Sequence, residues 1–251
     1  MAASASPKSA RTRWYRPRTL GRIAIGAGCL LVLLALLGVG YELILPSVGT
    51  AQLKVLQIDR SHQSQVGALA VPTRLGEAVV AVEDEHFYAG PLVNVLDGLG
   101  RAGLATLHGS GDPGGSTIDQ QLAKQLYGQG AGLTASIREL ALGLKLAVSY
   151  PANRILAMYL AAVYYGNHYW GDSAAAQGYF GLQPGQLSWA QAALLAGLPQ
   201  APSAYDPIHH YLAAKQRQLH VLDQLVANHD LTRAQARAAY RAPLGLRPGS
   251  S

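Results

Sequence analysis

The apolar residues of this chain form one long continuous run near the N-terminus, followed by a series of shorter helix-like patterns. The run extends from residue 23 to residue 45, reads IAIGAGCLLVLLALLGVGYELIL, and has one charged residue, Glu42, close to its end. About 20 apolar residues cross the roughly 30 Å core of a bilayer as a helix. The pattern therefore predicts a transmembrane helix at residues 23–45.

The charges around this run indicate its orientation. Five arginines precede it and no acidic residue does: Arg11, Arg13, Arg16, Arg18 and Arg22. By the positive-inside rule, the N-terminus stays in the cytoplasm and the chain after Leu45 lies outside. A cleaved signal peptide is the alternative, but the run is long for one and Leu45-Pro46-Ser47 is a poor cleavage site. We expect a basic tail at 1–22, an exported domain at 46–241 and a C-terminal tail at 242–251.

Helical patterns dominate the exported part from Leu75 onward. Apolar spacing predicts helices at 77–87, 153–165, 212–228 and 232–240. Ser188 caps a further helix up to Leu198. Ser116 with Asp119 and Thr117 with Gln120 both fit a capping box, so a helix is expected to start at this motif. Residues 136–149 are apolar nearly all round, which predicts a buried helix. Only Leu53 to Ile58 favours a short strand, so the expected fold class is mainly α.

Composition narrows the function classes. The chain has 251 residues, a net charge of +6 and a single cysteine, Cys29, so an internal disulfide framework is excluded. Much of the positive charge lies in the N-terminal arginine tail, where membrane topology and anionic lipids explain it better than nucleic acid does. No His, Cys and Asp cluster with the spacing of a structural metal site is visible.

Two carboxylates stand out because they lie on otherwise apolar helices. Glu83 begins an acidic triplet followed by Phe87 and Tyr88, and a partly buried carboxylate there is suited to act as a general base. The alternative is a solvated acidic turn. Glu139 needs a cavity or a partner, since an unpaired buried carboxylate is costly; an ion pair with Arg138 or Lys145 is the alternative for this residue.

The segment Gly114-Gly115-Ser116-Thr117-Ile118-Asp119-Gln120-Gln121-Leu122-Ala123-Lys124 places several hydrogen-bond donors at a helix start. Lys124 and Arg138 are candidate ligands for an anion such as a leaving diphosphate. A lysine on a solvated helix face is the ordinary alternative.

Together these segments resemble the signature motifs of the peptidoglycan glycosyltransferases, glycosyltransferase family 51. Glu83, Asp84 and Phe87 match the first motif, residues 114–124 match the second except at Asp119, and Glu139 matches the glutamate of the third. Residues 164–171, 174–181 and 192–203 continue the resemblance, and Arg217 with Val221 and Leu222 resembles the fifth motif. The resemblance covers roughly residues 70–225.

Several positions depart from the family pattern. The histidine after the first motif is absent, although His86 is nearby, and the Arg-Lys pair of the third motif is Ala135-Ser136. The fourth motif loses its Lys, Glu and Asn to Ala152, Ala157 and Ala161, and the second arginine of the fifth is Gln218. Arg154 is a candidate substitute for one lost cation.

The resemblance implies a lysozyme-like helical lobe with a smaller membrane-proximal lobe. It also implies a bacterial inner-membrane enzyme that polymerises lipid II into glycan strands, with Glu83 and Glu139 as catalytic residues. The implied substrate ligands are Asp84, Phe87, Gly115, Ser116, Thr117, Gln120, Gln121, Lys124, Arg138 and Arg217. Mg²⁺ or Mn²⁺ held with the diphosphate is the implied cofactor, and other cell-wall synthases are the implied protein partners.

Two other functions remain open. The substituted motif positions favour a non-catalytic scaffold that binds lipid II or cell-wall synthases, whereas Glu83 and Glu139 favour an enzyme. A lytic enzyme that cleaves glycan is the second alternative, because one fold can serve both reactions. The sequence contains no Ser-x-x-Lys, so a penicillin-binding transpeptidase domain is not expected.

Overall fold

A computed structural model of the chain describes residues 44–62, 69–90, 116–128, 130 and 132–247, together with Gly28, Val32, Gly40 and Val93. The chain divides into two units, Met1–Pro46 and Ser47–Ser251. The tail and most of the transmembrane segment expected from the sequence lie outside the described residues. Among the residues that are described, no helix combines the length and apolarity needed to cross a membrane.

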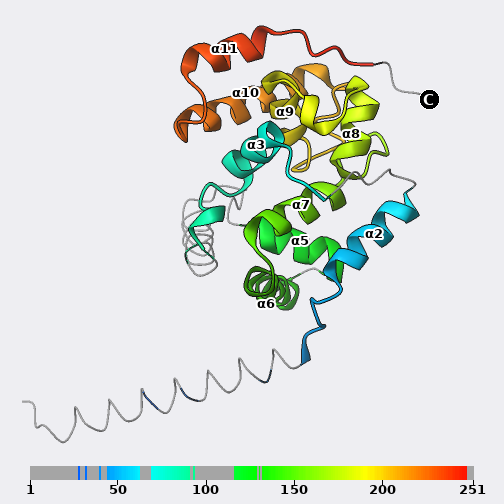
Figure 1. The fold of residues 1–251 in the computed structure, drawn as a ribbon, viewed down its shortest axis with the longest axis vertical. Helices are drawn as coiled ribbons and strands as arrows, with labels where there is room; N and C mark the ends of the chain where they lie inside the picture. Colours follow the sequence, from blue (N-terminus) through cyan, green and yellow to red (C-terminus); the bar gives the residue numbers. More distant parts are fainter. Residues whose placement is uncertain are drawn as a thin grey trace, which may run out of the picture. The chain divides into compact units, whose positions relative to one another are not determined.

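The second unit is mainly helical in its described part, as the sequence predicts (Figure 1). No strand occurs among the described residues, and the only bridge there joins Tyr164 to Trp170. The α-helices are α2 (Ala51–Ser61), α3 (Thr73–Glu83), α5 (Ile118–Tyr127), α6 (Leu133–Ser149), α7 (Ala152–Ala162), α8 (Gly171–Phe180), α9 (Trp189–Gly197), α10 (Tyr211–Ala227) and α11 (Arg233–Arg241). Two short 3₁₀ helices are η1 (Phe87–Ala89) and η2 (Pro184–Gln186).

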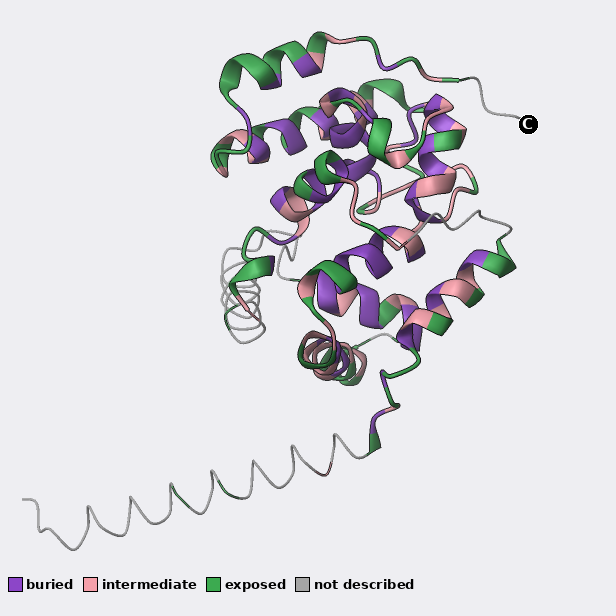
Figure 2. Cartoon of the chain, in the orientation of Figure 1, coloured by how far each residue is buried: buried purple, intermediate pink, exposed green. Residues whose placement is uncertain are grey.

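These helices pack in two groups. Helix α9 is buried on nearly every side and contacts α3, α10 and α11. In the other group α5 packs on α6 and α7, and α2 packs on α7 (Figure 1). Completely buried side chains occur in both groups, such as Leu75 of α3, Ile118 of α5, Leu156 of α7 and Leu195 of α9. Figure 2 shows buried residues concentrated between the helices.

Local sequence signals set several helix starts. Thr117 caps α5 and Ser188 caps α9, each through a reciprocal capping box with the glutamine three residues later. Thr232 does the same for α11. The predicted starts at Ser188 and Thr232 are therefore confirmed, and of the two capping boxes expected at the start of α5, Thr117 with Gln120 is the one that forms.

Four local predictions are wrong. The segment Leu53–Ile58 is helical, because Ala51, Val55 and Asp59 recur every four residues on the buried face of α2. Helix α3 ends at Glu83 rather than at Phe87, and α7 ends at Ala162 before a loop that turns at Gly166, whose φ is +85°. Helix α6 is not buried all round, since Ile137 and Val148 are exposed.

Candidate active site

The candidate active site is a pocket of about 460 Å³ where the two helix groups meet. Helices α3, α5, α6, α7 and α10 all contribute to its wall. It brings together seven of the predicted site residues: Glu83, Ser116, Gln120, Gln121, Lys124, Glu139 and Arg217. These residues are separated by up to 134 positions in the chain, and the fold brings their side chains into one pocket.

Glu83 is held by two partners at the end of α3. Gln121 Nε2 donates a hydrogen bond of 2.8 Å to Glu83 Oε2, and Arg217 Nη2 lies 3.6 Å from Glu83 Oε1. The side chains of Glu83 and Arg217 are 12% and 11% exposed. A partly buried carboxylate fixed in this way is aimed into the pocket and retains access to it.

Tyr159 on α7 fixes the amide that contacts Glu83. Its hydroxyl donates to Gln121 Oε1 at 3.0 Å, so the Nε2 end of the amide faces Glu83. Burial raises the pKa of Tyr159 well above its ordinary value, and the neighbouring negative charge of Glu83 adds to this effect. Tyr159 therefore remains a protonated donor at every physiological pH.

Two glycines allow the helices around the pocket to approach closely. A Cβ on Gly197 would lie 2.6 Å from Arg217 Cγ, and Arg217 Nε donates to the Gly197 carbonyl at 3.3 Å. A Cβ on Gly143 would lie 3.0 Å from the backbone nitrogen of Gln120. The space beside Gly143 is thus taken by α5, and Glu139, one turn earlier on α6, lines the same pocket as Gln120.

Four predicted substrate ligands do not line the pocket in the described structure. Asp84 is 1% exposed, and its Oδ2 accepts a 3.1 Å hydrogen bond from the Ile118 backbone N–H at the start of α5. Thr117 caps the same helix, Phe87 is buried, and Arg138 donates to the Tyr127 carbonyl at 3.3 Å. Asp84 and Thr117 position the second motif, since a carboxylate and a cap stabilise a helix N-terminus. Gly115 lies outside the described residues.

The pocket also contains residues to which sequence reasoning assigned no role. Tyr159, Gln200 and His220 line it. The sequence does contain a signal for Tyr159, because it is a tyrosine on an otherwise apolar helix and a buried hydroxyl group needs a hydrogen-bond partner. His220 lies three residues after Arg217 on α10, which places both on one side of the helix.

The departures from the family pattern do not all affect the pocket. Gln218 is completely buried, donates from Nε2 to the Ala190 carbonyl at 2.6 Å and accepts from Lys215. Arg154 lines a different pocket, of about 970 Å³, together with His86, Glu77 and Asp230. Neither Arg154 nor His86 therefore replaces a group beside Glu83, and Gln218 is a packing residue.

The larger pocket, which contains Arg154 but not Glu83, is a weaker candidate for the active site. In it, Glu77 and Asp230 have raised pKa values, chiefly because of burial, with the charge of Asp230 adding to the shift at Glu77. It lacks the residues of the second and third motifs. Within the described part of the chain, no group of three or more His, Cys, Asp or Glu side chains is arranged to hold a metal ion.

Comparison with known proteins agrees with the motif pattern. Residues 50–226 match the model of the family described as Transglycosylase. The chain belongs to this family. It is therefore a glycosyltransferase, and at the level of the family a peptidoglycan glycosyltransferase.

Individual relatives cover different shares of the chain. A transglycosylase-family protein of Cupriavidus necator is 34% identical over 226 residues, which are 90% of this chain and 94% of that protein. Penicillin-binding protein 1A of Neisseria flavescens is 37% identical over 69% of this chain but 22% of its own length. Penicillin-binding protein 1A of Haemophilus influenzae has a solved structure that is similar over 52% of this chain and 16% of its own, with 25% identity and a TM-score of 0.36. The chain thus spans about a fifth of the penicillin-binding proteins that it matches.

Proposed function

We propose that this transglycosylase polymerises lipid II, extending a lipid-linked glycan strand with release of the lipid diphosphate. The observation that carries the proposal is the pocket in which Glu83, Gln121 and Arg217 are in contact and Lys124 and Glu139 share the wall. A carboxylate base beside cationic groups is what glycosyl transfer from a diphosphate requires.

Glu83 is the general base of the proposed reaction. It takes the proton from the 4-hydroxyl of the acceptor sugar while that oxygen forms a bond to the anomeric carbon of the donor. The bond from that carbon to the diphosphate breaks, and the electron pair leaves with the diphosphate. Attack opposite the leaving group inverts the anomeric configuration.

Lys124 and Arg217 stabilise the leaving diphosphate from α5 and α10, and Gln120 and Ser116 add hydrogen-bond donors. Glu139 orients the donor. Because the described pocket has no three-ligand metal group of its own, Mg²⁺ or Mn²⁺ would have to share its coordination between Glu139 and the diphosphate.

We further propose that residues 23–45 anchor the enzyme in the inner membrane of a bacterium, with the N-terminus cytoplasmic and the catalytic domain outside. The apolar run and the preceding arginines support this arrangement. The family resemblance supports a lysozyme-like lobe with a smaller membrane-proximal lobe. Other cell-wall synthases are its proposed partners.

A scaffold that binds lipid II without turning it over is the second candidate. The alanines at 152, 157 and 161 favour it, because the family has Lys, Glu and Asn at these positions. Ala157 is 3% exposed and Ala161 half-buried, and none of the three lines the pocket. Their loss removes few direct contacts, so polymerase activity remains the better proposal.

Incubation of the purified full chain with labelled lipid II separates the candidates. Glycan ladders with Mg²⁺ or Mn²⁺ support the polymerase. Retained lipid II binding without product at any metal concentration supports the scaffold. Soluble fragments released from isolated sacculi would instead indicate a lytic enzyme.

A further inference from the structure

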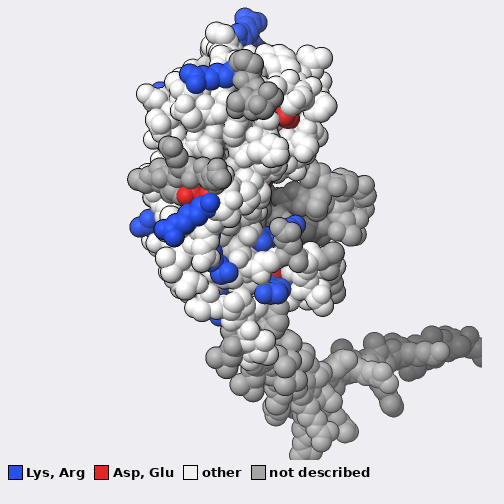
Figure 3. Space-filling model, turned by 90° about the vertical axis from the view of Figure 1, so that its right-hand side faces the viewer, with Lys and Arg blue, Asp and Glu red and all other residues white. Residues whose placement is uncertain are grey.

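The charged side chains that line the active-site pocket balance one another. Among the described lining residues there are two cations and two carboxylates, which are Lys124, Arg217, Glu83 and Glu139. Their formal net charge is therefore zero. By contrast, Lys and Arg side chains are much more evident than Asp and Glu on the face drawn in Figure 3. A neutral set of side chains gives little long-range attraction for a diphosphate, which carries a negative charge on each phosphate.

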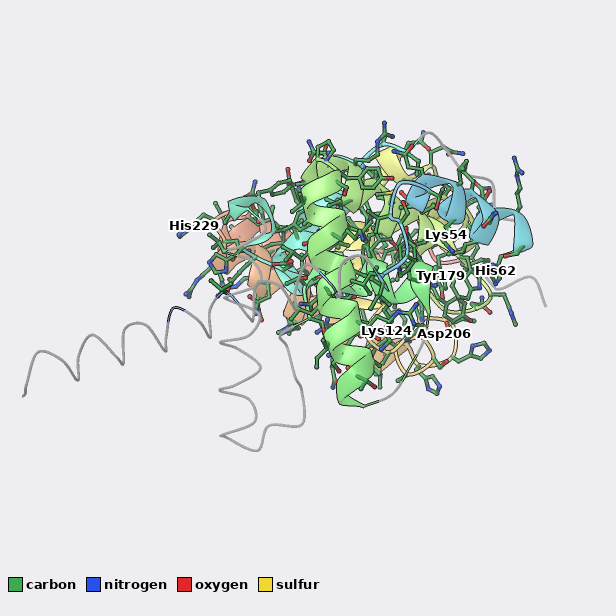
Figure 4. All side chains as sticks on the ribbon, turned by 90° about the horizontal axis from the view of Figure 1, so that it is seen from below. Lys54, His62, Lys124, Tyr179, Asp206 and His229 are labelled. Carbon is green, nitrogen blue, oxygen red and sulfur yellow. The ribbon has the colours of Figure 1, made fainter. Side chains whose placement is uncertain are left out.

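The two arginines within the altered third and fourth motifs add no charge to this lining. Arg138 donates to a backbone carbonyl of α5, and Arg154 lines the other pocket. Arg217 lies 3.6 Å from Glu83 Oε1 and donates to a backbone carbonyl of α9 at 3.3 Å, so part of its hydrogen-bonding capacity is already used. The second cation of the lining, Lys124, comes from α5, and Figure 4 shows it beside α6.

His220 is a further lining residue that can carry a positive charge. It lies on α10 three residues after Arg217, which puts the two side chains on one side of the helix. It is exposed, so a protonated imidazole at this position costs little desolvation energy. Histidine ordinarily changes its charge near pH 6.5, and both ring nitrogens are donors in the protonated form. Protonation of this imidazole therefore turns a neutral lining into a cationic one.

We propose that His220 is a ligand of the substrate diphosphate and that its protonated form replaces a cation that the altered motifs no longer supply. The inference rests on the proposed function, because it names a further substrate contact in the same pocket. Arg217 and His220 contact the diphosphate from one side of α10, and Lys124 contacts it from α5.

The groups around His220 determine how its charge responds to pH. Three carboxylates favour the protonated form, which are Glu83 on α3, Glu139 on α6 and Asp223 on α10. A bound diphosphate favours it too, whereas Lys124 and Arg217 oppose it. Tyr159 on α7 stays protonated and adds no charge. Diphosphate binding should therefore be tightest at mildly acidic pH and weaken as the pH rises and the imidazole loses its proton.

The test measures binding rather than turnover. The probe is a labelled lipid II analogue without the acceptor 4-hydroxyl, which keeps the diphosphate but cannot be polymerised. Its phosphates stay ionised across the range from about pH 5.5 to about pH 8.5, which brackets the ordinary pKa of histidine. The dissociation constant is measured with the full chain in detergent across this range, at one fixed Mg²⁺ concentration.

Three variants isolate the charge at position 220. His220→Gln keeps a hydrogen-bonding side chain but removes the charge, and His220→Lys makes the charge permanent. His210→Gln is the matched control, because His210 is exposed at the start of the same helix and lies outside the pocket. Since His220 is exposed, all three variants should unfold at the wild-type temperature.

Wild type and His210→Gln should bind the analogue about tenfold more tightly at the lower pH, as one charge-assisted contact implies. His220→Gln should show the weaker wild-type affinity at every pH, and His220→Lys the tighter one. A pH dependence that survives in His220→Gln overturns the proposal. A His220→Lys variant that binds no more tightly than wild type at the higher pH also overturns it.

These outcomes are distinguishable from failure of the proposed function. A chain that shows the expected pH dependence but makes no glycan from ordinary lipid II is a scaffold that uses His220. A chain that polymerises lipid II while His220→Gln retains the pH dependence keeps the proposed function and loses only this inference. Absence of binding at every pH contradicts both.

Discussion

Gln121 Nε2 donates a 2.8 Å hydrogen bond to Glu83 Oε2, and this contact joins the second motif to the last residue of α3. The amide cannot turn round without losing the Tyr159 hydroxyl, which donates to Gln121 Oε1 at 3.0 Å. The orientation of the proposed base is thus set by a residue on a third helix.

Tyr159→Phe should lower kcat about fivefold, because a net hydrogen bond contributes ~1 kcal/mol and its loss lets the amide reorient. KM for lipid II should change little, since Tyr159 acts through Gln121. Steady-state kinetics with labelled lipid II measures both. An unchanged kcat would show that the orientation of Gln121 does not depend on Tyr159.

Lys124→Ala should reduce kcat/KM by roughly 10- to 100-fold, as a charge-assisted hydrogen bond to the diphosphate contributes about 1.5–3 kcal/mol. Lys124→Arg should retain much of the activity. Lys54→Ala is the matched control, because Lys54 Nζ lies over the Tyr127 ring and outside the pocket. Equal losses at Lys54 and Lys124 would contradict a specific role for Lys124.

Restoring the arginine of the family pattern at position 218 should destabilise the protein without raising activity. Gln218 is completely buried and bonded to the Ala190 carbonyl and to Lys215. Gln218→Arg buries a charge beside an existing cation, at a cost of about 3 kcal/mol or more. Thermal and urea unfolding measure this loss. A stable and more active variant would show that position 218 does reach the substrate.

Stability should depend on pH through Asp172, at the start of α8. Burial raises its pKa from 3.8 to about 6, against a smaller opposite effect of hydrogen bonds from Ser173. The folded state therefore binds the proton more tightly than the unfolded state. The stability that this carboxyl gives is present in full below pH 4 and is lost as the pH rises through 6, by at most ~3 kcal/mol.

Asp172→Asn should accordingly stabilise the protein at pH 8 and have a much smaller effect at pH 4. The amide oxygen can still accept from the Ser173 backbone N–H, which donates to Asp172 Oδ1 at 2.9 Å. Urea unfolding of both proteins across this pH range checks the prediction. A pH-independent difference would mean that Asp172 does not titrate as described.

Local signals made part of this structure predictable. Thr117 and Ser188 mark helix starts because a capping box involves only four consecutive residues. The prediction of a strand at Leu53–Ile58 was wrong, because a six-residue apolar pattern fits both a strand and a helix. Only the longer spacing of the buried residues from Ala51 to Asp59 identifies this segment as a helix. The apolar pattern of residues 136–149 predicted a helix buried on all sides, but Ile137 and Val148 of α6 are exposed, because neighbouring helices cover only part of its surface.

The meeting of Glu83 with Gln121 and Arg217 could be anticipated only through the family resemblance. No local pattern brings residues so distant in sequence into contact. The burial of Gln218 and the placement of Arg154 in the other pocket depend on how α10 and α7 are rotated, which is a property of the packed core. These two positions show that a departure from a motif is informative only after its side chain has been located.

The most direct test of the account compares lipid II polymerisation by Glu83→Gln and Glu85→Gln with that of the wild type. Glu85 is the matched control, because it lies two residues on, is exposed and belongs to the other pocket. Loss of a general base predicts at least a roughly 10²-fold lower rate for Glu83→Gln, with lipid II binding retained and Glu85→Gln close to wild type. Polymerisation by Glu83→Gln at the wild-type rate would contradict the assignment of Glu83 as the base.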